Sequence, residues 1–201
     1  KGKPCMPTHE KAPAEVGRMV SRMMEQYHQP LALAGVRVDV LMVRPDLDAD
    51  NEPKGPALKV GGYEAEACIR VVSQKLRSLG LGDALMEIDA ANWEILPDEA
   101  QEALVDHELT HLELGVKLNK DGIEVVQYDK TTPTPRPKLK LRRHDCQMGL
   151  FDEVVRRHKK ASPEYRNWER FEANRVQKWL PYVGDAEAAS PKRIGKGAAQ
   201  A

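Results

Sequence analysis

The sequence predicts an α+β domain in which a small sheet packs against one central helix, with further helices toward both ends of the chain. Three observations predict this fold. Short segments rich in β-branched and apolar residues recur in the first half of the chain, as strands do. A stretch with apolar residues at helical spacing follows them, between Pro97 and Gly115. Other stretches with helical periodicity lie on either side of this central part.

The composition is that of an ordinary globular protein. Of 201 residues, 41% are hydrophobic and 31% charged, and 31 basic residues balance 31 acidic ones. This balance excludes a global electrostatic attraction to nucleic acid and leaves room only for a local basic patch. No apolar run reaches the roughly 18 residues of a membrane span, and no signal-peptide pattern is present. Three widely spaced cysteines predict free thiols in a reducing cytoplasm.

The first half of the chain is expected to hold the first helix and three main strands. Residues 1–13 read as a flexible lead-in. Apolar residues at helical spacing predict a helix from Ala14 to Tyr27, and His28 after it is expected to lie on the surface. Strands are predicted at 36–43, 67–72 and 84–89, with a shorter strand at 57–60, a helical turn at 74–79 and a short turn or helix at 92–96.

The central helix is predicted to run from about Glu99 to Leu114. Asp98 suits the N-cap, Gln101 three residues later completes a capping-box pattern, and Gly115 suits the C′ position. One stripe of this helix is expected to face the interior. It consists of Ala100, Ala103, Leu104, His107, His111 and Leu114.

This helix carries a His-Glu-x-x-His pattern at His107, Glu108 and His111. Residues four apart on a helix lie on one face, so both imidazoles would point to one place, as a tetrahedral Zn²⁺ requires. Glu108 lies about 100° around the helix from His107, within reach of a metal-bound water as general base. The alternative is an amphipathic helix with two chance histidines. Only six residues are His, so a chance match to this pattern is rare, and we expect a metal site that holds one Zn²⁺ per chain.

A catalytic zinc site needs a third protein ligand and an open position for water. His144 is the first candidate, because it lies at an expected strand-to-helix junction after the central helix. The alternatives are Asp145, Glu153, Asp152 and His158. Asp145 is also suited to orienting a ligand or capping its helix. Asp106, beside His107, is expected to face either solvent or a ligand.

If the site is catalytic, the reaction that its parts support is hydrolysis of a peptide bond. The metal would activate water and polarise a carbonyl, while Glu108 would take the proton of the water and pass it to the leaving amine. The developing oxyanion needs a further donor. Tyr128, Arg143 and Tyr165 are the candidates.

The last third of the chain is predicted to continue with a hairpin and two helices. Residues 123–128 and 139–143 are expected to pair as strands across an exposed loop at 129–137. A helix is predicted from Asp145 to about His158, and another from Ser162 to about Leu180. The resulting organisation is a domain at 14–160, a C-terminal helical extension at 161–184 and a disordered tail at 185–201.

Several motifs together resemble the phage metallopeptidase family. They are a strand ending in Asp89 with Trp93 nearby, the segment Leu96–His111, Asp121-Gly122 before a strand, and His144-Asp145 followed by Phe151 and Val154-Val155. The resemblance covers about residues 36–160, and the segment Leu96–His111 is its most specific part. A more distant similarity is to SprT-like proteases, which act on DNA-bound proteins.

The resemblance implies a compact zincin-like α+β domain with a small mixed sheet, encoded by a phage or prophage and acting on proteins or peptides in the bacterial cytoplasm. It implies His107, His111 and His144 as zinc ligands and Glu108 as the catalytic residue. Two alternatives remain. One is a zinc-stabilised binding protein without catalysis. The other is a DNA-associated protease that uses a basic patch of Arg136, Lys138, Lys140, Arg142, Arg143, Arg156, Arg157, Lys159 and Lys160.

Overall fold

The structure is a computed structural model, and it describes residues 7–129, 134–144 and 151–169. Contacts divide the chain into two units, Lys1–Tyr165 and Arg166–Ala201. All the helices and strands that are given a label below belong to the first unit. Among the described residues, no helix has both the length and the apolar character that crossing a membrane requires.

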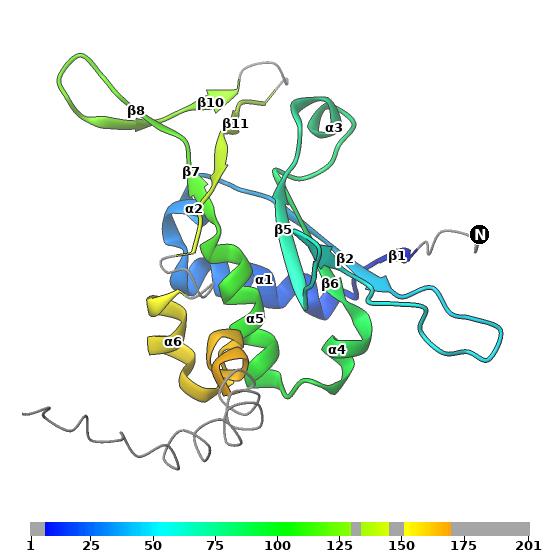
Figure 1. Cartoon of the computed structure of the whole chain (residues 1–201). Helices are drawn as coiled ribbons and strands as arrows, with labels where there is room; N and C mark the ends of the chain where they lie inside the picture. The colour runs from blue at the N-terminus through cyan, green and yellow to red at the C-terminus, as the bar shows by residue number, and fades with distance from the viewer. Residues whose placement is uncertain (1–6, 130–133, 145–150, 170–201) are drawn as a thin grey trace, which may run out of the picture. The chain divides into compact units, whose positions relative to one another are not determined.

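The centre of the first unit is a four-stranded mixed sheet with the order β1-β2-β6-β5. Its strands are Thr8–Lys11 (β1), Val38–Arg44 (β2), Ala84–Asp89 (β6) and Ala67–Val71 (β5). The two inner strands, β2 and β6, are parallel, and the outer strands are antiparallel to their neighbours. The three predicted main strands are present. β1 lies within the expected lead-in, where its residues pair with β2 (Figure 1).

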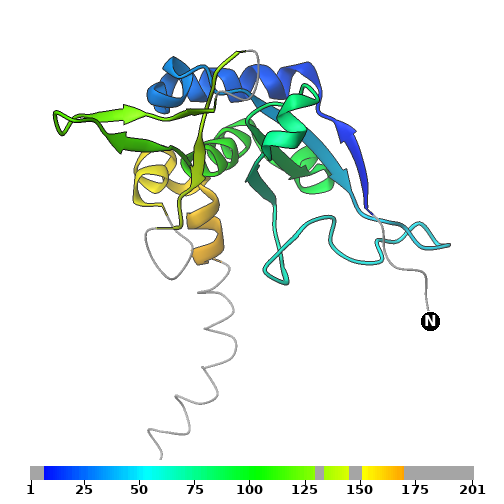
Figure 2. The same cartoon turned by 90° about the horizontal axis from the view of Figure 1, so that it is seen from above.

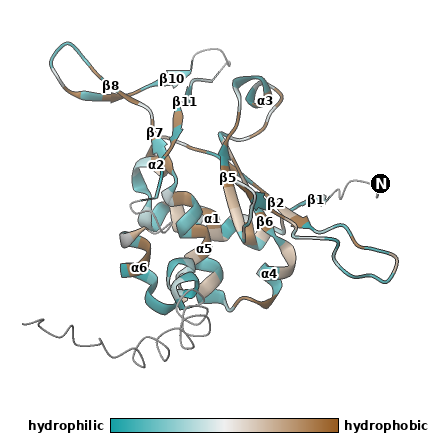
Figure 3. Ribbon diagram, in the orientation of Figure 1, coloured by the Kyte–Doolittle hydropathy of each residue, from teal (hydrophilic) through white to brown (hydrophobic). Residues whose placement is uncertain are grey.

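Two helices, α1 (Ala14–Tyr27) and α5 (Asp98–Thr110), contribute most of the helical side of the core. The bounds of α1 are the predicted ones. Alternating strand residues face these helices, because side chains two apart on a strand point to the same side. Buried members of this core include Val20 and Met23 of α1, Met42 of β2, Met86 and Ile88 of β6, Ile69 of β5, and Leu104, Val105 and Leu109 of α5. Figure 3 shows the hydrophobic residues of the central strands in brown.

Short elements connect the strands. α2 (Gln29–Leu33) follows α1, α3 (Gln74–Ser78) lies between β5 and β6, and α4 (Ala90–Ile95) follows β6 directly. Asp89 caps α4 by accepting from the backbone N–H groups of Ala91 and Asn92. The strands β3 (Lys59–Val60) and β4 (Tyr63–Glu64) form a small hairpin between β2 and β5. The predicted short strand and helical turns are therefore confirmed as elements.

The central helix α5 is shorter than predicted. It ends at Thr110, and Leu112–Leu114 form the strand β7 instead of a last helical turn. Its N-cap is Pro97 rather than Asp98. Gln101 makes no capping box but donates from its side chain to the carbonyls of Trp93 and Leu96.

Gly115 lies where three strand segments meet, and this explains the early end of the helix. Its N–H donates to the carbonyl of Lys138 at 2.7 Å, and its own carbonyl accepts from the N–H of Gln127 at 2.7 Å. A Cβ at this position would lie 3.2 Å from the Lys138 oxygen. Gly115 thus serves a close backbone approach and not a helix terminus. Pairing between strands distant in the sequence outweighs the local helical pattern.

A β-arm follows α5; it comprises residues 112–129 and 134–141 of the described chain. Its elements are β7, β8 (Val116–Leu118), β9 (Glu124–Val126), β10 (Tyr128–Asp129), β11 (Arg136–Pro137) and β12 (Leu139–Leu141). β8 pairs with β9, β10 with β11, and β12 with β7. Figures 1 and 2 show the β8–β9 hairpin projecting from the helices.

The predicted pairing of residues 123–128 with 139–143 is therefore wrong. Residues 124–126 pair with 116–118, and 139–141 pair with β7. A tight turn at Asn119–Gly122 accounts for the first pairing. The Asn119 side-chain oxygen accepts from the N–H groups of Asp121 and Ile123, and Gly122 has a φ of 77°.

The described chain ends with α6 (Asp152–His158), the short 3₁₀-helix η1 (Lys159–Ala161) and a helical stretch at 163–169. The predicted start of α6 at Asp145 lies outside the described residues, as do the expected end of the last helix near Leu180 and the tail at 185–201.

Candidate metal centre

Three histidines converge at the end of α5. His107 lies in its last turn, His111 follows its last residue, and His144 comes after β12. One ring nitrogen from each lies within 4.8 Å of the others, and this is the one such group of potential ligands among the described residues. The Nε2 atoms of His107 and His144 are 3.3 Å apart. Tetrahedral zinc with Zn–N bonds of about 2.0–2.1 Å requires a nitrogen–nitrogen distance of roughly 3.3 Å. The His107–His144 distance therefore suits a tetrahedral metal ion such as zinc, and the three imidazoles could hold a metal ion.

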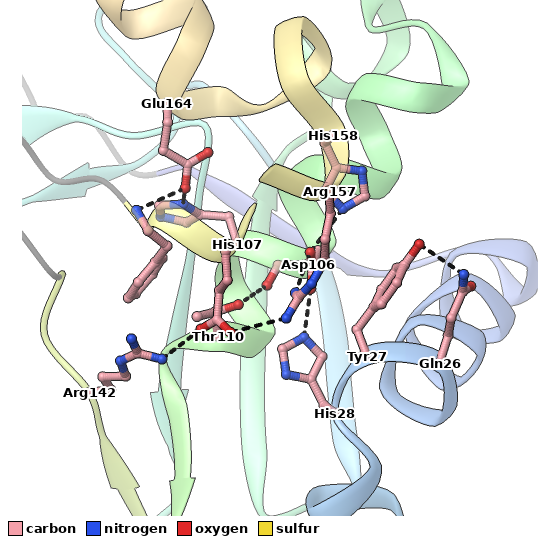
Figure 4. Close-up of polar contacts among 12 residues, drawn as sticks. Gln26, Tyr27, His28, Asp106, His107, Thr110, Arg142, Arg157, His158 and Glu164 are labelled. Atoms are coloured by element: carbon pink, nitrogen blue, oxygen red, sulfur yellow. Dashed lines mark hydrogen bonds and ion pairs between the residues drawn. The ribbon is translucent and has the colours of Figure 1, made fainter. Parts of the chain in front are cut away.

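Hydrogen bonds at the far side of two rings leave the facing nitrogens available. His111 Nδ1 lies 2.8 Å from the carbonyl oxygen of Arg142, which can only accept, so Nδ1 donates and Nε2 keeps its lone pair. His107 Nδ1 lies 2.7 Å from Oε1 of Glu164. A carboxylate there likewise fixes the proton on Nδ1. Figure 4 shows Glu164 reaching His107 from beyond the ring. This pattern is typical of metal-ligating histidines.

Phe151 packs against all three imidazoles. Its ring centroid lies 5.1 Å from that of His107, 4.8 Å from His111 and 4.9 Å from His144. The residue is fully buried. An apolar ring at this position keeps water away from one side of the cluster and limits how the imidazoles can turn. His144, in contrast, is exposed, so the cluster is open to solvent at its third member.

The pKa values of the two half-buried histidines, His107 and His111, are shifted in opposite directions in the metal-free chain. Burial lowers the pKa of His111 to about 4, aided by the neighbouring charges of His107, His144 and Arg142 and opposed by the Arg142 carbonyl. Burial also acts to lower the pKa of His107, but the hydrogen bond to Glu164 and the charges of Glu108 and Asp106 outweigh it, and the pKa is raised. His111 is consequently neutral at pH 7, as a ligand must be.

Glu108 is buried between α5 and the edge strand β5. Burial raises the pKa of its carboxyl to about 7, while the His107 cation and a hydrogen bond from the Ile69 backbone act to lower it. Ile69 belongs to β5, so this bond joins the metal helix to the edge of the sheet. A carboxyl with a pKa near neutrality is suited to both taking and giving a proton.

Asp106 is fully buried, so the expectation that it might face solvent is wrong. Its carboxylate oxygens lie 2.7 Å from His28 Nε2, 2.8 Å from Arg157 and 2.8 Å from His158 Nε2 (Figure 4). Burial acts to raise the pKa of Asp106, but these hydrogen bonds hold it well below its usual range. His28, expected on the surface, is instead a buried partner of this carboxylate; its side chain is 10% exposed.

The other predicted site residues are not all brought together. Glu153 binds Arg142 at 2.7 Å and Arg157 at 3.1 Å, and His158 binds Asp106, so both have partners other than the three-histidine cluster. Asp145 lies outside the described residues, and the side chain of Asp152 is not described.

The three predicted oxyanion donors lie in different elements. Tyr128 is exposed on β10 of the β-arm, Arg143 is exposed beside His144, and Tyr165 is half-buried directly after Glu164. The role of oxyanion donor stays a prediction for each of them.

Glu164 is the residue of this site that sequence reasoning missed. Its side chain is 1% exposed and contacts a histidine 57 positions earlier. The only local signal is the Ser162-Pro163-Glu164 helix start, which predicts a helix and not a partner for His107.

Three arginines of the candidate basic patch pair with carboxylates. Arg136 pairs with Asp83, Arg142 with Glu153, and Arg157 with Asp106. These three guanidinium groups therefore make contacts within the protein.

The fold and the donor set define a mixed α+β domain with a candidate metal site at the end of its central helix. The family model described as "Putative phage metallopeptidase" matches residues 8–176, and the chain belongs to this family. The family description suggests a metal ion and a peptidase activity. No curated protein and no solved structure matches the chain.

Proposed function

We propose that this protein is a zinc-dependent peptidase of phage or prophage origin that acts on proteins or peptides in the cytoplasm of the bacterial host. The observation that carries the proposal is the convergence of His107, His111 and His144 with Glu108 adjacent in the same helix. A site that only stabilised the fold would need the three imidazoles but would have no use for a buried carboxylate beside them.

The three imidazoles would hold the ion and leave its fourth position open. A bound Zn²⁺ lowers the pKa of a coordinated water and polarises a carbonyl group. The exposure of His144 supports access from solvent to this position.

Glu108 would move the proton. Its carboxylate accepts a proton from the attacking water and passes it to the nitrogen of the leaving amine, so that the C–N bond breaks as the amine becomes neutral. Its hydrogen bond from the Ile69 backbone holds the carboxylate at the edge of β5. We propose this role for Glu108 because it lies close to two potential metal ligands, His107 and His111.

The strand β5 offers a binding mode for an extended peptide. It is the outermost strand at its side of the four-stranded sheet, and it lies against α5. An edge strand can pair with a further strand through backbone hydrogen bonds. Such pairing does not depend on the side chains of the substrate. We propose that the substrate lies in extended form near this edge.

Metal analysis and one isosteric substitution test the proposal. The purified protein should contain about one zinc per chain and cleave members of a diverse peptide mixture. Glu108→Gln should keep the zinc and lose cleavage by at least about 100-fold, because a general base contributes roughly 10²–10⁴-fold. Glu99→Gln, an exposed change on the same helix, is the matched control.

Each outcome separates the candidates. Absence of zinc would exclude both the peptidase and the zinc-stabilised binding protein. Zinc without cleavage of any peptide would favour the binding protein. Full activity in Glu108→Gln would overturn the assigned mechanism.

A further inference from the structure

The segment 152–164 returns to the metal helix after the chain has passed His144. It consists of α6, η1 and the residues up to Glu164, and we call it the brace. The brace contacts α5 at two neighbouring positions. Arg157 and His158 reach Asp106, and Glu164 reaches His107. Figure 4 shows these two contacts side by side.

Asp106 connects the brace to α5. Its carboxylate is shared by His28 at the end of α1 and by two residues of α6, all within 2.8 Å. Removing a buried carboxylate from such a cluster leaves its cationic partners unpaired. The cluster thus holds α6 in one position against α5.

The second contact of the brace concerns His107 itself. Glu164 Oε1 lies 2.7 Å from His107 Nδ1 and 3.4 Å from the N–H of Phe151. The other oxygen, Oε2, is buried and has no hydrogen-bond partner within the described part of the chain. A buried carboxylate oxygen without a partner costs free energy. The contact that Glu164 makes through Oε1 orients the His107 imidazole and makes it more basic.

The brace also reaches the partner of His111. Glu153 of α6 accepts from Arg142 at 2.7 Å and from Arg157 at 3.1 Å. The backbone carbonyl of the same Arg142 accepts from His111 Nδ1. The Nδ1 partner of His107 thus belongs to residues 152–164, and the Nδ1 partner of His111 is bound by them.

We propose that Glu164 and Asp106 are positioning residues of the metal centre: Glu164 orients His107, and Asp106 anchors the brace that carries Glu164. This inference rests on the proposed metal site. The proposal predicts that Glu164 and Asp106 both affect metal affinity through the hydrogen bond between Glu164 and His107. Their effects on affinity should therefore be coupled.

A double-mutant cycle tests the proposal on the full chain. Zinc affinity is measured by competition with a chromogenic chelator, and folding of the metal-free variants by circular dichroism. Glu164→Gln should weaken zinc binding about 10–100-fold, the range for lost carboxylate partners of ligating histidines. Asp106→Asn should weaken it in the same direction. The double variant should bind zinc about as weakly as the single variant with the lower affinity. Its loss of affinity should be smaller than the product of the two single losses.

Matched controls and a spectroscopic readout separate positioning from stability. Glu99→Gln and Asp98→Asn are exposed changes on α5 and should leave zinc affinity unchanged. Co²⁺-loaded Glu164→Gln should show a shifted visible spectrum, because the imidazole of His107 is free to turn. A purely structural role would lower the unfolding midpoint and leave the spectrum of the folded protein unchanged.

The outcomes are distinguishable from failure of the proposed function. If the wild-type chain binds no zinc, the metal site itself is wrong. If the wild type binds zinc and Glu164→Gln binds it equally well, the positioning role is overturned, and fully multiplicative losses would overturn the coupling. If Asp106→Asn does not fold, Arg157→Met tests the same anchor from α6 and should weaken zinc binding only while Glu164 is present.

Discussion

Glu108 illustrates how burial sets the chemistry of a single residue. The carboxyl is 4% exposed, and burial raises its pKa to about 7 in the metal-free chain. The unfolded chain releases this proton near the ordinary pKa of 4.5, whereas the folded chain keeps it until about pH 7. Between these values the folded state binds more protons than the unfolded state. Glu108 therefore lowers stability as pH rises through this window.

Substitution of Glu108 by Gln should stabilise the metal-free protein above pH 7 and change little at pH 4.5. A shift from 4.5 to about 7 corresponds to roughly 3 kcal/mol as an upper bound. Urea unfolding of both proteins across pH 4.5–8 measures the difference. The lowered pKa of His111 has the opposite effect, because it stabilises the fold as pH rises from about 4 to 6.5. This contribution is common to the wild type and the variant, so it cancels when their free energies of unfolding are compared at each pH. A difference that does not grow with pH would contradict the buried, raised carboxyl.

At the scale of elements, the β-arm is joined to the sheet by a buried ion cluster. Asp83, just before β6, is 1% exposed and accepts from Arg136 of β11 at 2.6 Å and from the Arg37 N–H at 2.9 Å. Arg77 of α3 lies 3.5 Å from Asp83 and binds Asp129 of β10 at 3.1 Å. Strands that would be marginal as isolated hairpins are thus fixed to the core, and with them the strand β12 that leads to His144.

Asp83→Ala should destabilise the protein by about 3–5 kcal/mol, because it takes the carboxylate from the largely buried guanidinium group of Arg136 and leaves Arg77 with the carboxylate of Asp129 alone. Glu94→Ala is the control. Glu94 pairs with Arg44 at 2.7 Å at the surface, where both side chains are about half exposed, and its loss should cost less than about 1 kcal/mol. Urea denaturation measures both. Equal small losses would show that the ion cluster does not hold the β-arm.

At the scale of the molecule, a bound metal ion would link two segments of the first unit that are distant in the sequence, the end of α5 and the residues after β12. Zinc at about 100 times its dissociation constant should add roughly 2.7 kcal/mol to the free energy of unfolding. For a chain of this size that corresponds to a rise of roughly 5–10 °C in Tm. His144→Ala should lose most of this rise, whereas His9→Gln, on β1, should keep it. Differential scanning calorimetry with zinc and with a chelator measures the effect, and an unchanged shift in His144→Ala would exclude that residue as a ligand.

Much of the local structure follows from the residues themselves. The apolar spacing of α1 and the β-branched runs of the inner strands predict those elements, because burying one face requires that periodicity. The α+β class follows from their order. The pairing of the β-arm does not, because strands distant in the sequence choose partners by global geometry. For the same reason the helical pattern through Leu114 gives way to β7.

By itself, the sequence determined the family and the chemical identity of the candidate site. The four-residue spacing of His107 and His111 places both side chains on one face of any helix that this segment forms. Glu108 then lies beside His107 on the same helix. Only the tertiary structure decided which side chains support them. Asp106 meets residues 51, 52 and 78 positions away, and Glu164 meets His107 across 57. Such contacts leave no periodic signal, because they depend on how packed elements bring distant segments of the chain together.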